Sequence, residues 1–234
     1  MFHFFEALKE YKNIGLQEFS GNEPTLYQRL SHDPKVKQIF QDAMHELSEH
    51  ANKDLVNHID LSTTKFLVDI GGGDGTNIIE LAKKFTKLDA AVFDLPTVCP
   101  ITEKKIKESG LDNRLKAIPG NCFENDFPGN ADCFLFSHFC TIWSEQKNKS
   151  LFRKAFNALP KGGKIIIFNM MQDNDETGPL STALGSPYFL TIATGEGMLY
   201  TWAEYEEWIK EAGFSDITKI KLPQDHGAII GIKH

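Results

Sequence analysis

The sequence predicts an α/β domain in which a mostly parallel, doubly wound sheet follows a helical segment. From residue 65 onward, short β-branched runs alternate with amphipathic helical stretches, which is the pattern of right-handed βαβ units. The stretch "VDIGGGDGTNIIELA", residues 68–82, leads from an apolar strand through a glycine turn into a helix. Near the end, "SDITKIK" and "AIIGIK" are separated by too few residues for a helix, so they predict an antiparallel terminal hairpin.

The expected elements can be placed in chain order from their periodicity. Strands are predicted at residues 65–70, 90–94, 115–118, 132–137, 164–169, 215–221 and 228–233, which makes a seven-stranded sheet. Helices fit residues 75–86, 98–109, 145–158 and 201–212. Residues 1–60 contain "FFEALKEY" and a longer helical stretch that begins at "DPKVK", and they form a predicted helical cap. Residues 61–234 form the predicted ligand-binding domain.

Composition limits the classes of function. The 234 residues carry a net charge of −7 without long charged runs, which argues against a nucleic-acid surface. No stretch approaches the roughly 20 apolar residues of a membrane span, and the first residues lack the features of a signal peptide. The four cysteines show neither CxxC nor Cys/His zinc spacing, so we expect reduced, buried cysteines and no metal. These features predict a cytoplasmic protein.

The glycine turn predicts a ligand that approaches the backbone closely, because glycine leaves no side chain in the way. A P-loop is excluded because no Lys-Ser/Thr pair follows, and Thr76 stands where the dinucleotide fingerprint has its third glycine. Asp69 and Asp74 disfavour pyrophosphate and suit an ammonium group. S-adenosylmethionine has an ammonium group, a sulfonium and no phosphate. Asp94, at the end of the next strand, can accept hydrogen bonds from both ribose hydroxyls.

Six ordered motifs carry a family resemblance: "LVDIGGGDGTN", "FDLPTV", "GNCFENDFP", "HFCTIWSEQ", "LPKGGKIII" and "YTWAEYEEWIKEAGF". Over residues 20–234 the chain resembles the class I S-adenosylmethionine-dependent O-methyltransferases, in the branch of caffeate-type enzymes and bacterial antibiotic and polyketide tailoring enzymes. The resemblance implies a Rossmann-like methyltransferase fold. It also implies methyl transfer to an oxygen of a small-molecule or carrier-bound acceptor. The family's winged-helix dimerisation domain is missing, so we expect a shortened enzyme or a domain of a larger synthase.

The resemblance also assigns the cofactor site residue by residue. It places the glycine turn around the amino-acid end of the cofactor, Asp94 on its ribose and Leu95 on its adenine. The family's acidic contact to adenine falls on Asn121, whose amide oxygen can still accept from the adenine amino group. The set also includes Asp69 before the turn, Ser137 in place of a family lysine, and the two residues after Asn121. The expected cofactor contacts are therefore Asp69, Gly71, Gly72, Gly73, Asp94, Leu95, Asn121, Cys122, Phe123 and Ser137.

The resemblance fails at the catalytic base. The histidine of the family's His-Asp-Trp stretch falls on Thr141, and the carboxylate that orients it falls on Asn169. His138, which ends the fourth strand at the ligand edge, is the first replacement considered, and His226 in the terminal turn is the second, with Asp225 as its orienting partner. A third option is no base at all, because alignment with the sulfonium suffices for an acidic phenol or enol.

Aromatic residues in the ligand-edge loops and the cap predict an apolar acceptor pocket. The expected wall consists of Phe40, Met44, Trp143, Tyr188 and Phe189, with Tyr200 nearby. The glycine-rich residues 178–200 form an expected lid over the acceptor. Three alternatives stay open. They are methylation of nitrogen, sulfur or carbon on the same scaffold, a cofactor-binding module that has lost transfer, and, more remotely, a nicotinamide dehydrogenase.

Overall fold

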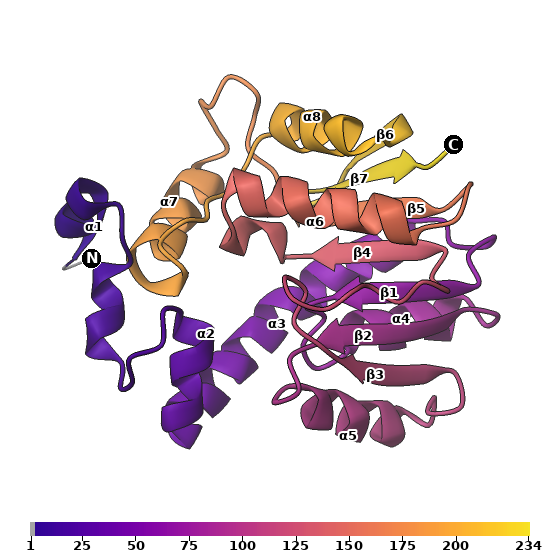
Figure 1. The fold of residues 1–234 in the computed structure, drawn as a ribbon, viewed down its shortest axis with the longest axis horizontal. Coiled ribbons are helices and arrows are strands. Elements are labelled where there is room, and N and C mark those ends of the chain that lie inside the picture. Colours follow the sequence, from indigo (N-terminus) through magenta and orange to yellow (C-terminus); the bar gives the residue numbers. More distant parts are fainter. Residues whose placement is uncertain (1–2) are drawn as a thin grey trace.

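The computed structural model describes residues 3–234, apart from the side chains of residues 41, 44, 45 and 47–50. One seven-stranded sheet has the order β3-β2-β1-β4-β5-β7-β6 (Figure 1). Its strands are β1 (Phe66–Ile70), β2 (Asp89–Asp94), β3 (Leu115–Pro119), β4 (Cys133–Ser137), β5 (Lys164–Met170), β6 (Ser215–Lys221) and β7 (His226–Ile232). The predicted fold class is confirmed, and each strand begins and ends within two residues of its predicted bounds.

The last strand reverses direction. Strands β1 to β5 pair in parallel, whereas β7 lies antiparallel between β5 and β6. The pairing of β7 with β5 begins two residues earlier than predicted, because His226 pairs with Met170. This register brings the start of β7 to the edge where the parallel strands end, which is the edge where doubly wound sheets bind ligands.

Helices cover both faces of the sheet. Helices α6 (Glu145–Ala158) and α8 (Trp202–Ala212) pack on one face in a core that includes Phe152 and Trp208. The opposite core includes Leu55 and Ile78, from α3 (Pro34–His58) and α4 (Thr76–Lys84). Helix α5 (Cys99–Ser109) packs beside α4. Figure 1 shows α6 in front of the strands and α4 behind them. Both faces of the central strands β1, β2, β4 and β5 are therefore buried, as their apolar sequences require, whereas the edge strand β6 is mostly exposed.

The segments outside the sheet are more helical than expected. The N-terminal part consists of α1 (Phe4–Glu10), η1 (Ile14–Glu18), α2 (Leu26–Arg29), η2 (Leu30–His32) and the first turns of α3. The segment expected to form a lid, residues 178–200, contains α7 (Leu180–Tyr188) and the π-helical turn η4 (Phe189–Ala193). Turn η4 lies against η1 and against η3 (Cys140–Ile142), so the lid segment joins the cap to the sheet edge.

Candidate active site

The glycine turn after β1 is closed on one side and open on the other. Gly71 has a φ of 69°, and a Cβ on it would lie 2.2 Å from the Phe139 ring, so only glycine fits there. Gly73 also has a left-handed backbone, with φ 57°, but a Cβ on it would meet no atom within 4 Å. The backbone at Gly73 is therefore accessible to a ligand, while Gly71 is fixed by packing.

Asp94 links the glycine turn to the end of β2. Its Oδ2 accepts a hydrogen bond from the Gly73 N–H at 2.9 Å, and its Oδ1 accepts from the Leu95 N–H at 2.7 Å. The Thr102 hydroxyl donates to the Gly73 carbonyl at 2.5 Å and so holds the next peptide group, on the other side of the Gly73 Cα. Burial raises the pKa of Asp94, although these two N–H groups oppose the rise. The carboxylate lies beside the open face of the turn, as the sequence predicts.

Asp69 lies beneath the turn instead of on its surface. The side chain is completely buried, and a Cβ on Gly72 would lie 2.7 Å from its carboxylate. Its Oδ2 accepts from the Asn77 amide at 3.2 Å, whereas Oδ1 is inaccessible and has no hydrogen-bond partner among the described residues. Burial, reinforced by the nearby charges of Asp94 and Asp74, raises the pKa of Asp69 to about 8. A buried acceptor without a donor indicates that a donor belongs there.

Asp74 does not offer the open negative charge that the sequence suggests. Its Oδ2 forms an ion pair with Lys105, and its Oδ1 accepts from the N–H and hydroxyl of Thr76 at the start of α4. Burial opposes ionisation, but these hydrogen bonds outweigh it, so the pKa of Asp74 is lowered. Asp74 therefore satisfies the N–H of the first residue of α4 and neutralises Lys105. Asp94 is then the carboxylate of the turn region that disfavours pyrophosphate, because the raised pKa of Asp69 leaves that carboxyl largely protonated at neutral pH.

Three of the expected cofactor contacts, Asn121, Cys122 and Phe123, follow β3. The Asn121 amide oxygen accepts from the Phe123 N–H at 3.0 Å, so one of its two acceptor positions is already used. Phe123 is 36% exposed and contacts Trp143 edge to face, with ring centroids 4.7 Å apart. Cys122 is half-buried, and burial raises the pKa of its thiol to about 12. Ser137 is buried, and its hydroxyl has no partner among the described residues.

The two candidate histidines are neighbours. His138 follows β4 with a left-handed backbone, φ 51°, and its N–H donates to the Phe168 carbonyl at 2.8 Å. The His138 and His226 rings lie 5.1 Å apart. His226 Nδ1 is 2.8 Å from the Gln224 carbonyl, which can only accept, so Nδ1 carries the proton and Nε2 is left as the acceptor. His138 Nε2 is inaccessible and has no partner among the described residues.

Both histidines are neutral at pH 7. Burial, with a contribution from His226, lowers the pKa of His138 to about 3. Burial also lowers the pKa of His226, against the opposing effect of its hydrogen bond to the Gln224 carbonyl. The prediction that Asp225 orients His226 is wrong, because the Asp225 carboxylate accepts from the Ser181 hydroxyl at 2.7 Å. The backbone carbonyl of Gln224 orients the ring instead.

The positions that carry the family's catalytic groups are closed. Thr141 is 3% exposed, and its carbonyl lies against Gly197. Asn169 is fully buried, and its amide donates to the Tyr205 hydroxyl at 3.3 Å. Neither side chain can accept a proton at neutral pH. The site therefore lacks the family's histidine and carboxylate at these two positions, and a local shift of the chain does not account for their absence.

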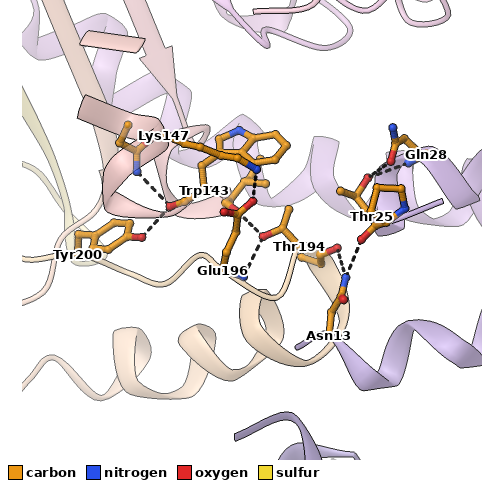
Figure 2. Close-up of polar contacts among 12 residues, drawn as sticks. Asn13, Thr25, Gln28, Trp143, Lys147, Thr194, Glu196 and Tyr200 are labelled. Carbon is orange, nitrogen blue, oxygen red and sulfur yellow. Dashed lines mark hydrogen bonds and ion pairs between the residues drawn. The ribbon is translucent and has the colours of Figure 1, made fainter. Parts of the chain in front are cut away.

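A polar network fixes the second half of the lid segment against the start of α6 (Figure 2). The Tyr200 hydroxyl donates to the Trp143 carbonyl at 2.7 Å, and Lys147 forms an ion pair with Glu196. The Lys147 ammonium also lies 4.7 Å from the centroid of the Trp143 ring. The Thr194 hydroxyl donates to the carbonyl of residue 142. Tyr200 itself is 4% exposed and packs in the core, so its expected place near the acceptor needs correction.

The expected acceptor wall lies in two places. Phe40 and Tyr188 pack in the apolar cluster of the helical cap, and the Tyr188 ring contacts Phe189 at a centroid distance of 5.1 Å. Trp143 lies on the sheet side, against Phe123. The side chain of Met44 is outside the described residues. The lid segment connects the two parts, because it contains Tyr188 and, at its other end, Tyr200, whose hydroxyl donates to the Trp143 carbonyl.

Sequence reasoning missed four residues of this region. Phe139 supports Gly71, Thr102 holds the Gly73 carbonyl, Lys105 pairs with Asp74 and Ser181 binds Asp225. Each partner lies far away in sequence, so no local pattern marks these contacts.

Two further properties concern metals and membranes. Within the described part of the chain, no group of three His, Cys, Asp or Glu side chains is arranged to hold a metal ion. In the same residues, no helix has both the length and the apolar character needed to cross a membrane.

Comparisons with known proteins agree with this geometry. An L-tyrosine C(3)-methyltransferase of Streptomyces lavendulae is 42% identical over 234 residues, covering 98% of this chain and 64% of the relative. A 3-hydroxy-5-methyl-1-naphthoate 3-O-methyltransferase of Streptomyces sahachiroi is 31% identical, covering 83% of this chain and 56% of the relative. This chain thus spans less than two thirds of the length of these relatives.

Solved structures and a family model complete the comparison. The apo structure of the S-adenosylmethionine-dependent methyltransferase SibL has a TM-score of 0.86 and 34% identity, covering 99% of this chain and 68% of that one. Human N-acetylserotonin methyltransferase has a TM-score of 0.89 at 24% identity, covering 99% of this chain and 65% of that one, which supports the fold alone. The family model described as "O-methyltransferase domain" matches residues 3–215. The chain therefore belongs to the O-methyltransferase domain family.

Proposed function

We propose that this chain transfers a methyl group from S-adenosylmethionine to an oxygen of a small aromatic molecule. The observation that carries the proposal is the glycine turn, open at Gly73, with the Asp94 carboxylate beside it and the unpartnered Asp69 oxygen beneath it. Relatives whose names describe S-adenosylmethionine dependence or 3-O-methylation of a naphthoate support the same activity.

The described residues fit this cofactor. Asp69 offers a buried oxygen without a donor, which suits an ammonium group, and Asp94 can accept from ribose hydroxyls in place of the Gly73 N–H. Leu95 and Phe123 are each 36% exposed and offer apolar surface for a purine ring. No lysine or arginine is needed, because the cofactor has no phosphate. When bound, the cofactor supplies an electrophilic methyl group on a sulfonium.

The chain's own residues then have two tasks. The first is alignment of the acceptor, to which Trp143, Tyr188 and Phe189 contribute aromatic surface. The second is removal of the proton from the acceptor hydroxyl. His138 and His226 are both neutral, so each ring carries a lone pair at physiological pH, although the Nε2 of His138 is inaccessible in this structure. This reading needs no metal ion.

A second candidate is methylation of a ring carbon next to a phenolic hydroxyl. The 42% identical relative is named as an L-tyrosine C(3)-methyltransferase, which favours this alternative. Two adjacent imidazoles also suit it, because carbon methylation requires the loss of a ring proton as well as activation of the hydroxyl. In either case the acceptor is a small molecule, free or bound to an acyl carrier, and a cytoplasmic location is part of the proposal.

Calorimetry tests the cofactor. S-Adenosylmethionine and S-adenosylhomocysteine are expected to bind in the micromolar range, and NAD is not. Asp94→Ala is expected to weaken binding by about 1.5–3 kcal/mol, the loss of hydrogen bonds to a charged group. Asp112→Ala, at an exposed position away from the turn, is the matched control. Unchanged affinity in Asp94→Ala would refute the ribose assignment.

An acceptor panel tests the reaction. L-Tyrosine, simple phenols, hydroxynaphthoates and their carrier thioesters are incubated with methyl-¹³C cofactor, and the products are analysed by mass spectrometry and NMR. A methoxy carbon in the product supports oxygen methylation, and an aryl methyl carbon supports the second candidate. Cofactor binding without methylation of any acceptor would favour a binding module that has lost transfer.

A further inference from the structure

We propose that the hydrogen bond between Ser181 and Asp225 couples the docking of α7 to the orientation of His226. This inference rests on the proposed role of His226 as a proton acceptor. Ser181 and Asp225 would then be positioning residues, because they act on the acceptor site through His226. Through this coupling, His226 has the orientation of a proton acceptor only when α7 is docked on the β6–β7 turn.

The turn that presents His226 is strained. Gln224 and Asp225 are both in the left-handed region, with φ 54° and 60°. Residues other than glycine seldom adopt this conformation, and two in succession persist only where contacts hold them. The Gln224 carbonyl, 2.8 Å from His226 Nδ1, is the group that fixes the tautomer of His226. Relaxation of the turn would therefore move that carbonyl and release the ring.

Two contacts hold the turn at Asp225. Its backbone carbonyl accepts from the Met171 N–H at 2.8 Å, and its carboxylate accepts from the Ser181 hydroxyl at 2.7 Å. Ser181 lies in the first turn of α7, whose N-cap residue Pro179 makes no side-chain cap. The Asp225 carboxylate stabilises α7 from this position, because the backbone N–H groups at a helix N-terminus lack partners and attract negative charge. The bond therefore stabilises the turn and the helix together.

The two ends of the lid segment are held unequally. The second half is fixed by the polar network of Thr194, Glu196 and Tyr200 (Figure 2). Among the described residues, Ser181–Asp225 is the only side-chain hydrogen bond between α7 and the β6–β7 turn. Leu180 and Leu184, on α7, are 74% and 65% exposed, so little apolar burial holds this helix.

This asymmetry gives α7 a natural hinge. Breaking the exposed Ser181–Asp225 bond loosens its N-terminal end, which then still keeps the bond from the Asp173 N–H to the Gly178 carbonyl beside it and the buried Thr182, while η4 stays attached to the cap and to η3. Helix α7 ends at Tyr188, an expected acceptor contact that stays packed in the cap cluster, so displacement of the N-terminal end would uncover the turn that presents His226. Return of the helix restores the Ser181 bond, and with it the strained turn and the Nδ1-protonated form of His226.

The test uses NMR of the chain without cofactor or acceptor. Imidazole ¹⁵N spectra of the wild type are expected to show His226 as a single tautomer protonated at Nδ1. Ser181→Ala is expected to add the other tautomer and to speed amide exchange in α7 by about three- to tenfold, the equivalent of one hydrogen bond. Ser181→Thr keeps the hydroxyl and is expected to restore both signals. Thr177→Ala removes an exposed hydrogen bond to Asp175 in the same segment and serves as the control.

Turnover provides the second measurement. With an acceptor that the panel shows to be methylated, Ser181→Ala is expected to lower kcat by about three- to tenfold while the affinity for S-adenosylhomocysteine is unchanged. Wild-type tautomer and exchange rates in Ser181→Ala would overturn the coupling. The spectra need no reaction, so failure of the coupling and failure of the proposed activity are separate outcomes.

Discussion

The imidazole rings of His138 and His226 lie edge to face, with centroids 5.1 Å apart and planes at 74°. The topology of the sheet explains this contact, because β7 runs antiparallel beside β5 and brings its first residue to the edge where β4 ends. Phe168 of β5 belongs to the core and contacts both rings. Two residues that the sequence offers as alternatives are therefore parts of one site.

The first prediction concerns the dependence of turnover on pH. An ordinary histidine base would make turnover rise with pH through about 6.5. Burial lowers the pKa of His138 to about 3, so this ring is neutral well below pH 6, and burial also lowers the pKa of His226 from its ordinary value. If His138 is the proton acceptor, we expect a flat profile of kcat between pH 6 and 8, and if His226 is, we expect a rise whose midpoint lies below that of an ordinary histidine. A rise of kcat centred near pH 6.5 would contradict the lowered values.

The second prediction separates the two histidines. If either is the proton acceptor, its replacement by alanine is expected to lower kcat by about 10²–10⁴-fold and to leave cofactor affinity nearly intact. Because the rings touch, the effects of His138→Ala and His226→Ala are expected to be far from additive in the double variant. Near-normal turnover in both single variants would eliminate the base and restrict the acceptor to acidic phenols and enols.

The third prediction follows from the burial of Asp69. Its pKa is raised to about 8, so at pH 6.5 the carboxyl is protonated in the free protein. An ammonium group beside it favours the carboxylate, so binding of S-adenosylhomocysteine is expected to release about one proton at pH 6.5. Calorimetry in buffers of different ionisation enthalpy measures this release. The same experiment on Asp69→Asn is expected to show none.

The same carboxyl affects stability. A carboxyl group with a raised pKa in the folded state stabilises the protein below its unfolded pKa, and this contribution is lost as pH rises through about 8. Asp69→Asn removes the titration, so the melting temperature of the variant is expected to change less between pH 5 and 8. Parallel pH dependence in the variant and wild type would contradict the raised pKa.

The elements of the sheet could be predicted because their periodicity is local. Each strand from β1 to β6 begins and ends within one residue of its expected bounds, and only the start of β7 differs by two. Helix α7 is not among the predicted helices, because its Gly185 and Pro187 are usual helix breakers. Contacts of η4 with the cap and with η3 evidently outweigh that weak local preference.

Residues of the site could be predicted only where they belong to a local sequence motif. The positions of Gly73 and Asp94 follow from a strand–turn–helix pattern and its neighbour in the sheet. The pairing of Lys105 with Asp74 and of Ser181 with Asp225 joins residues 31 and 44 positions apart, and no periodicity relates them. The number of carboxylates in the turn sequence is therefore larger than the negative charge that the folded turn offers to a ligand.

The fourth prediction concerns metal ions. The described residues contain no cluster suited to a divalent cation, and the proposed proton acceptors are neutral imidazoles. We expect turnover to be unchanged by EDTA and by added Mg²⁺. Loss of turnover with chelator, recovered with one specific cation, would require a different account of how the acceptor hydroxyl is activated.

The last prediction asks whether a base is needed at all. Thr141 stands where the family has its histidine, but it is 3% exposed and packed against Gly197. Thr141→His is expected to destabilise the fold by about 1–3 kcal/mol through overpacking, and Thr141→Val serves as the size-matched control. In the wild-type background we expect no gain in turnover.

The informative background for Thr141→His is the double variant without His138 and His226. If the double variant is inactive and Thr141→His restores turnover, the reaction needs an imidazole near the acceptor, and the family position can still supply it. If the double variant is inactive and nothing is restored, the buried position 141 does not reach the acceptor, and the pair beside β7 is the site of proton transfer. If the double variant retains turnover, alignment alone suffices, because the acceptor must then arrive already deprotonated.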